Sequence, residues 1–190
     1  MSNPVFDLVI VGVGGQGTLL ASKILGHLAL ELGCDVKVSE VHGMAQRGGS
    51  VITHVRVGEK VNAPLVSLGS ADYLLAFEEL EAARAIPFLK PAGALIVNTQ
   101  RILPMPVITG AAKYPEEPLC ASDEVCRMQR LDALKMAEAC GSQRAVNLVL
   151  LGALSKHLLW EKAVWHKAIE ACVPPKTLEI NIKAFDAGAQ

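Results

Sequence analysis

The junction between a short apolar run and a glycine-rich turn constrains the fold of this chain more than any other feature. The run Phe6–Val11 is rich in β-branched residues and leads directly into GVGGQG, Gly12–Gly17. The next segment, Gln16–Leu32, is long and apolar and stops at Gly33. This order predicts a strand, a tight turn and a helix. Glycines at such a turn let backbone N–H groups approach a phosphate at the positive end of the helix.

The turn is compatible with more than one function. Glu40 lies 23 residues after Gly17, about where a dinucleotide-binding fold places its ribose-binding acid, so a free-standing NAD(P)-dependent oxidoreductase component is one hypothesis. A second is that the glycines only make a closely packed turn. A third is an adenylating enzyme, although such enzymes usually carry paired CxxC zinc ligands and this chain contains no CxxC. The turn residues concerned are Gly12, Gly14, Gly15, Gln16 and Gly17.

The later strands predict an α/β fold with an irregular connection. Val36–Val41 and Ser50–Val57 are the second and third strands, and only residues 42–49 lie between them. A parallel crossover needs about a dozen residues or more, so these two strands are not joined by an ordinary βαβ unit. The alternation resumes with strands Asp72–Phe77 and Ala94–Asn98. We therefore expect a Rossmann-like, three-layer, mostly parallel sheet with an irregular connection after strand two.

The remaining segments are a proline-rich loop and a helical C-terminal third. Leu103–Pro118 is expected to be irregular, with a short ribbon near residues 107–108. The helices expected around the sheet and at the C-terminal end are Glu78–Ile86, Leu134–Cys140, Gln143–Leu159 with Ser142 as N-cap, Glu161–Ala171 and Lys176–Phe185. The one that begins at Gln143 is apolar nearly all round, which predicts a central core helix or a subunit contact.

Polar and glycine residues crowd into the loop after the second strand, where ligands gather in open α/β sheets. Arg47 offers a bidentate fork for a carboxylate or phosphate, and His42 adds an imidazole that can donate or accept a hydrogen bond. Asn147 is expected to be a buried amide bonded to backbone or to the glycine turn. His54 and Arg56 are assigned to the surface, and no pair of acids stands out. The loop residues assigned to a site are Glu40, His42, Gly43, Met44, Gln46, Arg47, Gly48 and Gly49.

Composition limits the possible partners. The net charge of −1 gives no general attraction for nucleic acid or an anionic membrane, and aromatic residues are only 4%. The apolar stretches fall short of the roughly 18 residues of a membrane span, and the N-terminus does not resemble a secretory signal, so a cytoplasmic protein is expected. Five scattered cysteines predict reduced thiols and no metal or cluster motif. With 51% hydrophobic and 19% charged residues, a single domain, 1–190, partly covered by another subunit is expected.

Four sequence blocks together resemble a known family. They are LVIVGVGGQGTLLASKIL, SEVHGMAQRGGSVITHVRVG, RAVNLVLLGAL and AFDAG. The chain resembles the beta subunits of indolepyruvate ferredoxin oxidoreductases and, more widely, the gamma domains of 2-oxoacid:ferredoxin oxidoreductases. The similarity runs from about Phe6 to Gly188, and HGMAQRGG is far more specific than the glycine turn alone.

The resemblance implies an accessory subunit that is inactive alone. Enzymes of this family decarboxylate a 2-oxoacid, here an aryl pyruvate, on thiamine diphosphate and pass electrons through [4Fe–4S] clusters to ferredoxin, with release of an acyl-CoA. It further implies that a large alpha subunit holds the thiamine diphosphate and the clusters, and that this chain binds none of them firmly. The loop from Glu40 to Gly49 would then lie at the subunit interface near the cofactor, and the glycine turn would be fold architecture or a phosphate-facing edge.

Overall fold

The computed structural model describes residues 5–42, 48–119, 126–158 and 160–190. In this part of the chain the strands form one six-stranded sheet in the order β2-β3-β1-β4-β5-β6. The strands are β1 (Phe6–Val13), β2 (Asp35–His42), β3 (Ser50–Gly58), β4 (Ala71–Ala76), β5 (Leu89–Asn98) and β6 (Arg127–Leu131). β3 is antiparallel to both β1 and β2, whereas β1, β4, β5 and β6 pair in parallel. The mostly parallel sheet and the irregular connection after strand two are therefore confirmed.

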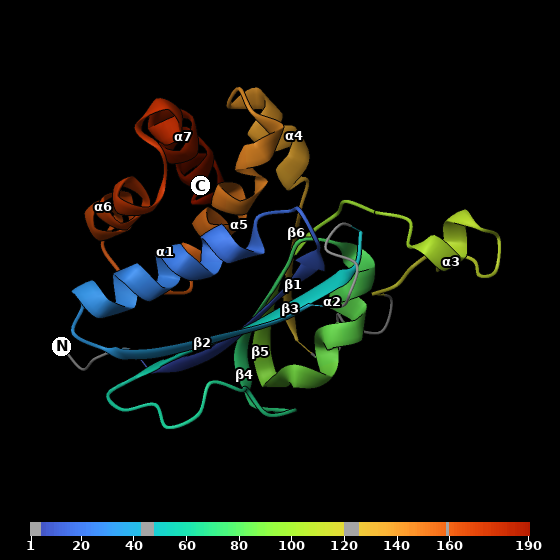
Figure 1. Ribbon diagram of the computed structural model, residues 1–190, viewed down its shortest axis with the longest axis horizontal. Helices are drawn as coiled ribbons and strands as arrows, with labels where there is room; N and C mark the ends of the chain where they lie inside the picture. Colours follow the sequence, from blue (N-terminus) through green and yellow to red (C-terminus); the bar gives the residue numbers. More distant parts are fainter. Residues whose placement is uncertain (1–4, 43–47, 120–125, 159) are drawn as a thin grey trace.

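Helices lie on both faces of this sheet, as a three-layer fold requires (Figure 1). α1, α4, α5, α6 and α7 are on one face and α2 is on the other. The α-helices are α1 (Thr18–Glu31), α2 (Glu79–Ala85), α3 (Met105–Ile108), α4 (Ala133–Ala139), α5 (Val146–Ser155), α6 (Lys162–Cys172) and α7 (Leu178–Gly188). Short 3-10 turns are found at Ile86–Phe88, Gln143–Ala145 and Pro175–Thr177.

Apart from Asp7, β1 is apolar because both of its faces are buried. Leu8 and Ile10 belong to a large core with α1 and the C-terminal helices, whereas Val9 and Val11 belong to a smaller core with α2. The alternation of side chains along a strand accounts for this division. The apolar helix α5 is central to the large core, since every residue from Val146 to Leu154 is buried. Among the described residues, no helix has the length and apolarity needed to cross a bilayer.

Two of the elements expected from the sequence were wrong, and one strand was missed. Residues 107–108 form no ribbon but belong to the short helix α3. The helix expected to run from Gln143 to Leu159 is a 3-10 turn followed by α5, which ends at Ser155, although Ser142 does accept a hydrogen bond from the amide of Arg144. The edge strand β6 was missed. Its sequence, RMQRL, lacks apolar alternation because the strand is half-exposed and, within the described part of the chain, pairs with β5 alone.

Candidate functional site

The side chain of Gln16 closes the glycine turn from within. Its Oε1 accepts a hydrogen bond from the amide of Val13 at 2.7 Å, and its Nε2 donates to the carbonyl of Phe77 at 3.0 Å and to Oε1 of Gln100 at 3.2 Å. These bonds tie the end of β1 to the ends of β4 and β5. The turn is therefore a fixed corner at the carboxyl edge of the sheet, where ligands of open α/β folds bind.

Packing explains two of the glycines in this turn. A Cβ at Gly12 would meet Oε1 of Gln16 and Cβ of Phe77, each at 2.9 Å. Gly17 has a φ of 90°, and a Cβ there would meet Nδ2 of Asn147 at 2.8 Å. Asn147 is buried, and its amide donates to the carbonyl of Gly17 at 3.4 Å, which is the contact expected from the sequence. Close approach of side chains thus accounts for Gly12 and Gly17 without any bound phosphate.

A pocket of about 410 Å³ opens beside the turn. It is lined by Gly14, Gly15, Gly17, Thr18, Leu19, Glu40, His42 and Val51. Oε2 of Glu40 accepts a hydrogen bond from the Thr53 hydroxyl at 3.2 Å, and Oε1 of Glu40 lies 3.7 Å from Nδ1 of His42. The N-cap of α1 is Gly17, and among the described residues no side chain caps this end of the helix. The pocket therefore combines the positive end of a helix with one fixed carboxylate.

We call residues 40–49 the polar loop. Its C-terminal end contacts the glycine turn. The amide of Gly14 donates to the carbonyl of Gly49 at 2.8 Å, so residue 49 lies directly against the turn. Gly48 has a φ of 78°, a conformation that favours glycine. The other assigned loop residues, Gly43, Met44, Gln46 and Arg47, lie outside the described residues. The structure thus brings together Glu40, His42, Gly49 and the glycine turn.

The topology weakens the dinucleotide hypothesis. In a dinucleotide-binding fold, the strand that carries the ribose-binding acid lies beside the first strand. Here β3 lies between β1 and β2, so Glu40 is two strand spacings, roughly 9.5 Å, from β1. The amide of Gly14 is also already bonded to the Gly49 carbonyl. Glu40 shares the pocket with the turn but does not occupy the position that the nicotinamide hypothesis requires.

Three buried carboxylates at the end of β4 were missed from the sequence. Glu78, Glu79 and Glu81 are at most 6% exposed. Glu79 binds Nε of Arg101 at 2.6 Å, and Glu81 binds both Arg84 and the hydroxyl of Ser50, at 2.6 and 2.5 Å. The sequence did contain an indication of this cluster, since three acids in four residues follow an apolar strand directly. Through Ser50, the cluster reaches the start of β3 and hence the polar loop.

Glu78 organises the segment that follows β5. Its Oε2 caps α2 through the amide of Glu81 at 2.9 Å, and its Oε1 accepts from the Tyr114 hydroxyl at 2.6 Å and the Ile102 amide at 3.1 Å. Burial, followed by the hydrogen bond to Glu78, raises the pKa of Tyr114 well above its usual range. Tyr114 is therefore a neutral hydrogen-bond donor throughout the physiological pH range.

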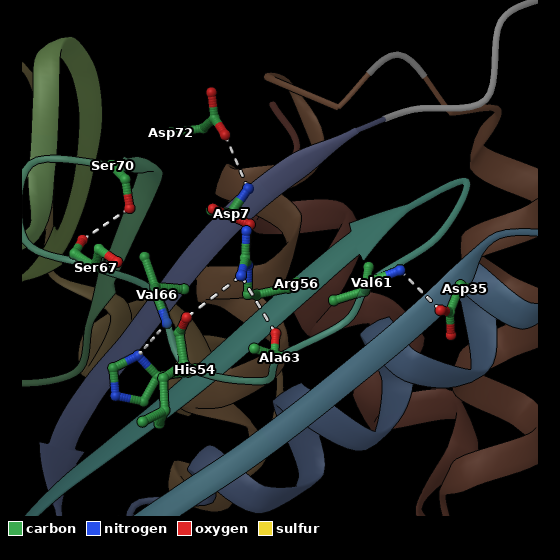
Figure 2. A network of polar contacts seen from close by, with 11 residues as sticks. Asp7, Asp35, His54, Arg56, Val61, Ala63, Val66, Ser67, Ser70 and Asp72 are labelled. Atoms are coloured by element: carbon green, nitrogen blue, oxygen red, sulfur yellow. Dashed lines mark hydrogen bonds and ion pairs between the residues drawn. The ribbon is translucent and has the colours of Figure 1, made fainter.

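A second polar network fixes the segment between β3 and β4, residues 59–70, on the sheet (Figure 2). Arg56 binds Asp7 at 2.8 Å and donates to the carbonyl of Ala63 at 3.2 Å. His54, expected at the surface, is 5% exposed because this segment covers it, and its Nδ1 accepts from the amide of Val66 at 3.3 Å. Burial lowers the pKa of His54. These bonds give His54 and Arg56 a structural role.

The described residues do not fit a metal ion or an iron–sulfur cluster. Within them, no three His, Cys, Asp or Glu side chains converge as metal ligands would. The described cysteines are spread over the fold, at Cys34, Cys126, Cys140 and Cys172. Burial raises the pKa of Cys34, which disfavours the thiolate that a metal would need.

Comparison with known proteins extends over the whole described fold. Indolepyruvate oxidoreductase subunit IorB of Thermococcus kodakarensis is 42% identical over 97% of this chain and 95% of its own length. The keto/oxoacid ferredoxin oxidoreductase gamma subunit of Geobacter sulfurreducens superposes with a TM-score of 0.72 at 25% identity, covering 96% of this chain and 95% of that one.

The same fold also occurs inside a longer chain. It matches 30% of a 2-oxoglutarate:ferredoxin oxidoreductase chain from Magnetococcus marinus, with a TM-score of 0.72, 19% identity and 97% of this chain covered. The model of the pyruvate ferredoxin/flavodoxin oxidoreductase family matches residues 7–190. The chain therefore belongs to the pyruvate ferredoxin/flavodoxin oxidoreductase family.

Proposed function

We propose that this chain is the small, accessory subunit of an indolepyruvate-type ferredoxin oxidoreductase. The observation that carries the proposal is the 42% identity, over nearly the full length of both chains, to an indolepyruvate oxidoreductase subunit. A 2-oxoglutarate synthase subunit of Methanothermobacter thermautotrophicus is only 30% identical over a similar span. This difference favours an aryl pyruvate as the substrate of the complete enzyme.

The assignment of the cofactors to the two subunits rests in part on which ligand sets the described residues contain. They contain no convergent set of metal ligands, so we assign the [4Fe–4S] clusters to a large partner subunit. As the family resemblance implies, we assign the thiamine diphosphate to the same subunit. Thiamine diphosphate bound there would supply the electron sink for decarboxylation. Electrons would pass to ferredoxin through the complex, and CoA would accept the aryl-acetyl group. The chain alone is expected to be catalytically silent and to work in the cytoplasm.

The pocket beside the glycine turn gives this chain its part in the site. The uncapped start of α1 attracts negative charge, and Glu40 and His42 line the same pocket. We propose that this edge, with the loop to Gly49, faces the large subunit near its cofactor. Arg47, at the centre of that loop in sequence, would supply a forked cation for a carboxylate or phosphate.

Reconstitution tests this function. The chain and the large subunit, each purified without oxygen from the same source, are assayed separately and mixed for indolepyruvate-dependent reduction of ferredoxin in the presence of CoA. We expect turnover only in the mixture, faster with indolepyruvate than with 2-oxoglutarate. Turnover by the chain alone would contradict the accessory role, and a preference for 2-oxoglutarate would contradict the substrate assignment.

The loop is tested in the same assay. Arg47→Ala should lower the activity of the assembled enzyme by at least tenfold, the loss of about one charge-assisted contact, while the thermal midpoint of the free chain stays within about 2 °C. Arg127→Ala is the matched control, because Arg127 is exposed at the start of the edge strand β6, outside the loop. Saturable binding of NAD(H) to the free chain, abolished by Gly14→Val, would instead support the nicotinamide hypothesis.

A further inference from the structure

Residues 101–118 form an arm that projects from the body of the protein and carries α3 at its tip (Figure 1). No residue of α3 is buried. Three large apolar side chains in the arm face solvent, with exposed fractions of 51% for Leu103, 65% for Met105 and 62% for Ile108. From residue 102 to residue 112 the sequence, ILPMPVITGAA, contains no charged side chain. An exposed apolar and uncharged surface of this kind marks a protein interface.

The base of the arm is held rigidly. Glu78 accepts hydrogen bonds from the Tyr114 hydroxyl and the Ile102 amide, one from each of the two chain segments at the base of the arm. Arg101 binds the Glu79 carboxylate and donates to the carbonyl of Glu116 at 2.8 Å. Because two buried carboxylates fix both sides of the base, the arm is ordered before it meets a partner. Binding then costs less conformational entropy than the docking of a flexible loop.

The tip has a defined fold of its own. The Val107 amide donates to the carbonyl of Pro104 at 2.9 Å, and the Thr109 hydroxyl donates to the carbonyl of Met105 at 3.0 Å. The amide of Ala112 closes the return with a bond to the carbonyl of Pro106 at 2.9 Å. Backbone polar groups at the tip are thus bonded internally, so an apolar cleft can receive the tip at little cost in desolvation.

The same fold occurs joined to further oxidoreductase domains in a solved structure. In the Magnetococcus marinus enzyme the same fold makes up 30% of a longer oxidoreductase chain, so there it is joined to other domains.

We propose that the arm is a preformed apolar hook that inserts its tip, Leu103, Met105 and Ile108, into an uncharged cleft of the large oxidoreductase subunit. This rests on the function proposed above and adds the surface that makes the contact. The base of the arm adjoins the glycine turn, because Gln100, next to Arg101, bonds to Gln16 at 3.2 Å. Insertion of the hook therefore brings the large subunit to the carboxyl edge of the sheet, beside the candidate site.

Binding measurements separate the hook from the rest of the surface. The affinity of the full chain for the purified large subunit is measured by fluorescence anisotropy for three forms. These are the wild type, the double variant Met105→Glu with Ile108→Glu, and Leu68→Glu, which places the same charge at a 68% exposed leucine outside the arm. We expect the double variant to bind at least about 30-fold more weakly, the loss typical of central interface contacts. Leu68→Glu should stay within about threefold.

Site-specific cross-linking gives a second measurement. A photoreactive phenylalanine analogue at position 108 should join the chain to the large subunit, whereas the same group at position 68 should not. Circular dichroism and the thermal midpoint of the free chain should match the wild type in every variant, since all the altered side chains are exposed.

Failure of the hook and failure of the proposed function would give different results. If the double variant binds within threefold of the wild type, the hook is wrong, although the proposed function stands whenever the mixture still turns over indolepyruvate. If the chain binds the large subunit through the arm but the mixture has no such activity, the function is wrong and the hook remains. Failure of the wild type to bind would overturn both. Dimers of the free chain that the double variant abolishes would show that the hook serves a second copy instead.

Discussion

The two faces of the sheet are held by different physical means. On one face, α1 and the C-terminal helices pack through a continuous apolar core that includes Trp165 and Phe185. On the other face, the core is smaller. Buried or half-buried polar groups such as Glu78, His54 and Arg56 hold the arm and the segment 59–70 in place there. We call these the apolar face and the polar face.

The difference separates stability from positioning. Apolar packing is strong but non-directional, whereas a buried carboxylate with several donors fixes the geometry of the groups around it. The polar face carries the arm, through Glu78 and Glu79, and it reaches the polar loop, through Glu81 and Ser50. We therefore expect changes on the apolar face to unfold the protein, and changes on the polar face to displace the arm and the loop at smaller cost.

The largest effect is expected for Gly152→Ala on the apolar face. A Cβ at Gly152 in α5 would lie 2.0 Å from the carbonyl oxygen of Phe185 in α7, so the two helices would have to separate. Overpacking against backbone should lower the free energy of unfolding by about 3 kcal/mol or more. Urea denaturation followed by circular dichroism measures this loss.

Gly26→Ala is the matched control, since Gly26 also lies within a helix, α1, but a Cβ there meets no heavy atom within 4 Å. Because alanine favours helix over glycine, this change should raise the free energy of unfolding by about 0.5–1 kcal/mol. Equal effects of the two substitutions would show that helix–helix contact does not dominate on the apolar face.

A smaller and more local effect is expected for Glu78→Gln on the polar face. The carboxylate accepts from Tyr114, Ile102 and Glu81, and a glutamine side chain has only one acceptor oxygen for these donors. We expect a loss of about 1–3 kcal/mol in the free energy of unfolding, with faster hydrogen exchange confined to the arm and the start of α2. Exchange mass spectrometry resolves the two regions.

Glu116→Gln serves as the control for Glu78→Gln, because Glu116 lies in the arm but its side chain is exposed. Its exchange pattern should match that of the wild type. If Glu78→Gln instead accelerated exchange in α5 and α7 as well, the polar and apolar faces would be a single cooperative unit and the distinction between them would fail.

The sequence predicted the apolar face well because its signals are periodic. The buried run of β1 and the all-round apolarity of α5 follow directly from burial, and the eight residues between the second and third strands excluded a crossover helix. The contact between Asn147 and the glycine turn was also expected, since a buried amide needs a partner. The family resemblance then supplied a function that the fold alone does not give.

The polar face was predicted less well because its structure depends on contacts between residues far apart in the chain. His54 was assigned to the surface from strand alternation alone, and the covering segment, residues 59–70, carries no periodic signal. Glu78 looks like an ordinary surface acid until Tyr114, 36 residues away, bonds to it. The roles assigned to Glu40, Arg47 and the rest of the polar loop stay predictions.

The smallest effect is a pH dependence that distinguishes one histidine on each face. Burial lowers the pKa of both His54 and His157, the latter also through nearby cations. The unfolded chain takes up a proton near pH 6.5, whereas the folded chain does so only at lower pH. The unfolded state therefore binds more protons below pH 6.5. The free energy of unfolding should fall as pH drops from 6.5, by at most about 1.4 kcal/mol per pH unit for each histidine.

His54 differs from His157 in one respect that hydrogen exchange can detect. Its neutral Nδ1 accepts from the Val66 amide, and protonation of that nitrogen would break the bond that holds the segment 59–70 on the polar face. As the pH drops from 7.5 to 5.5, the protection of the Val66 amide, the intrinsic exchange rate at each pH divided by the measured rate, should decrease in the wild type. His54→Asn, whose side-chain oxygen can accept the same bond at any pH, should abolish this decrease, while His157→Asn should retain it. An identical response in both variants would mean that the segment is released by global unfolding rather than by His54.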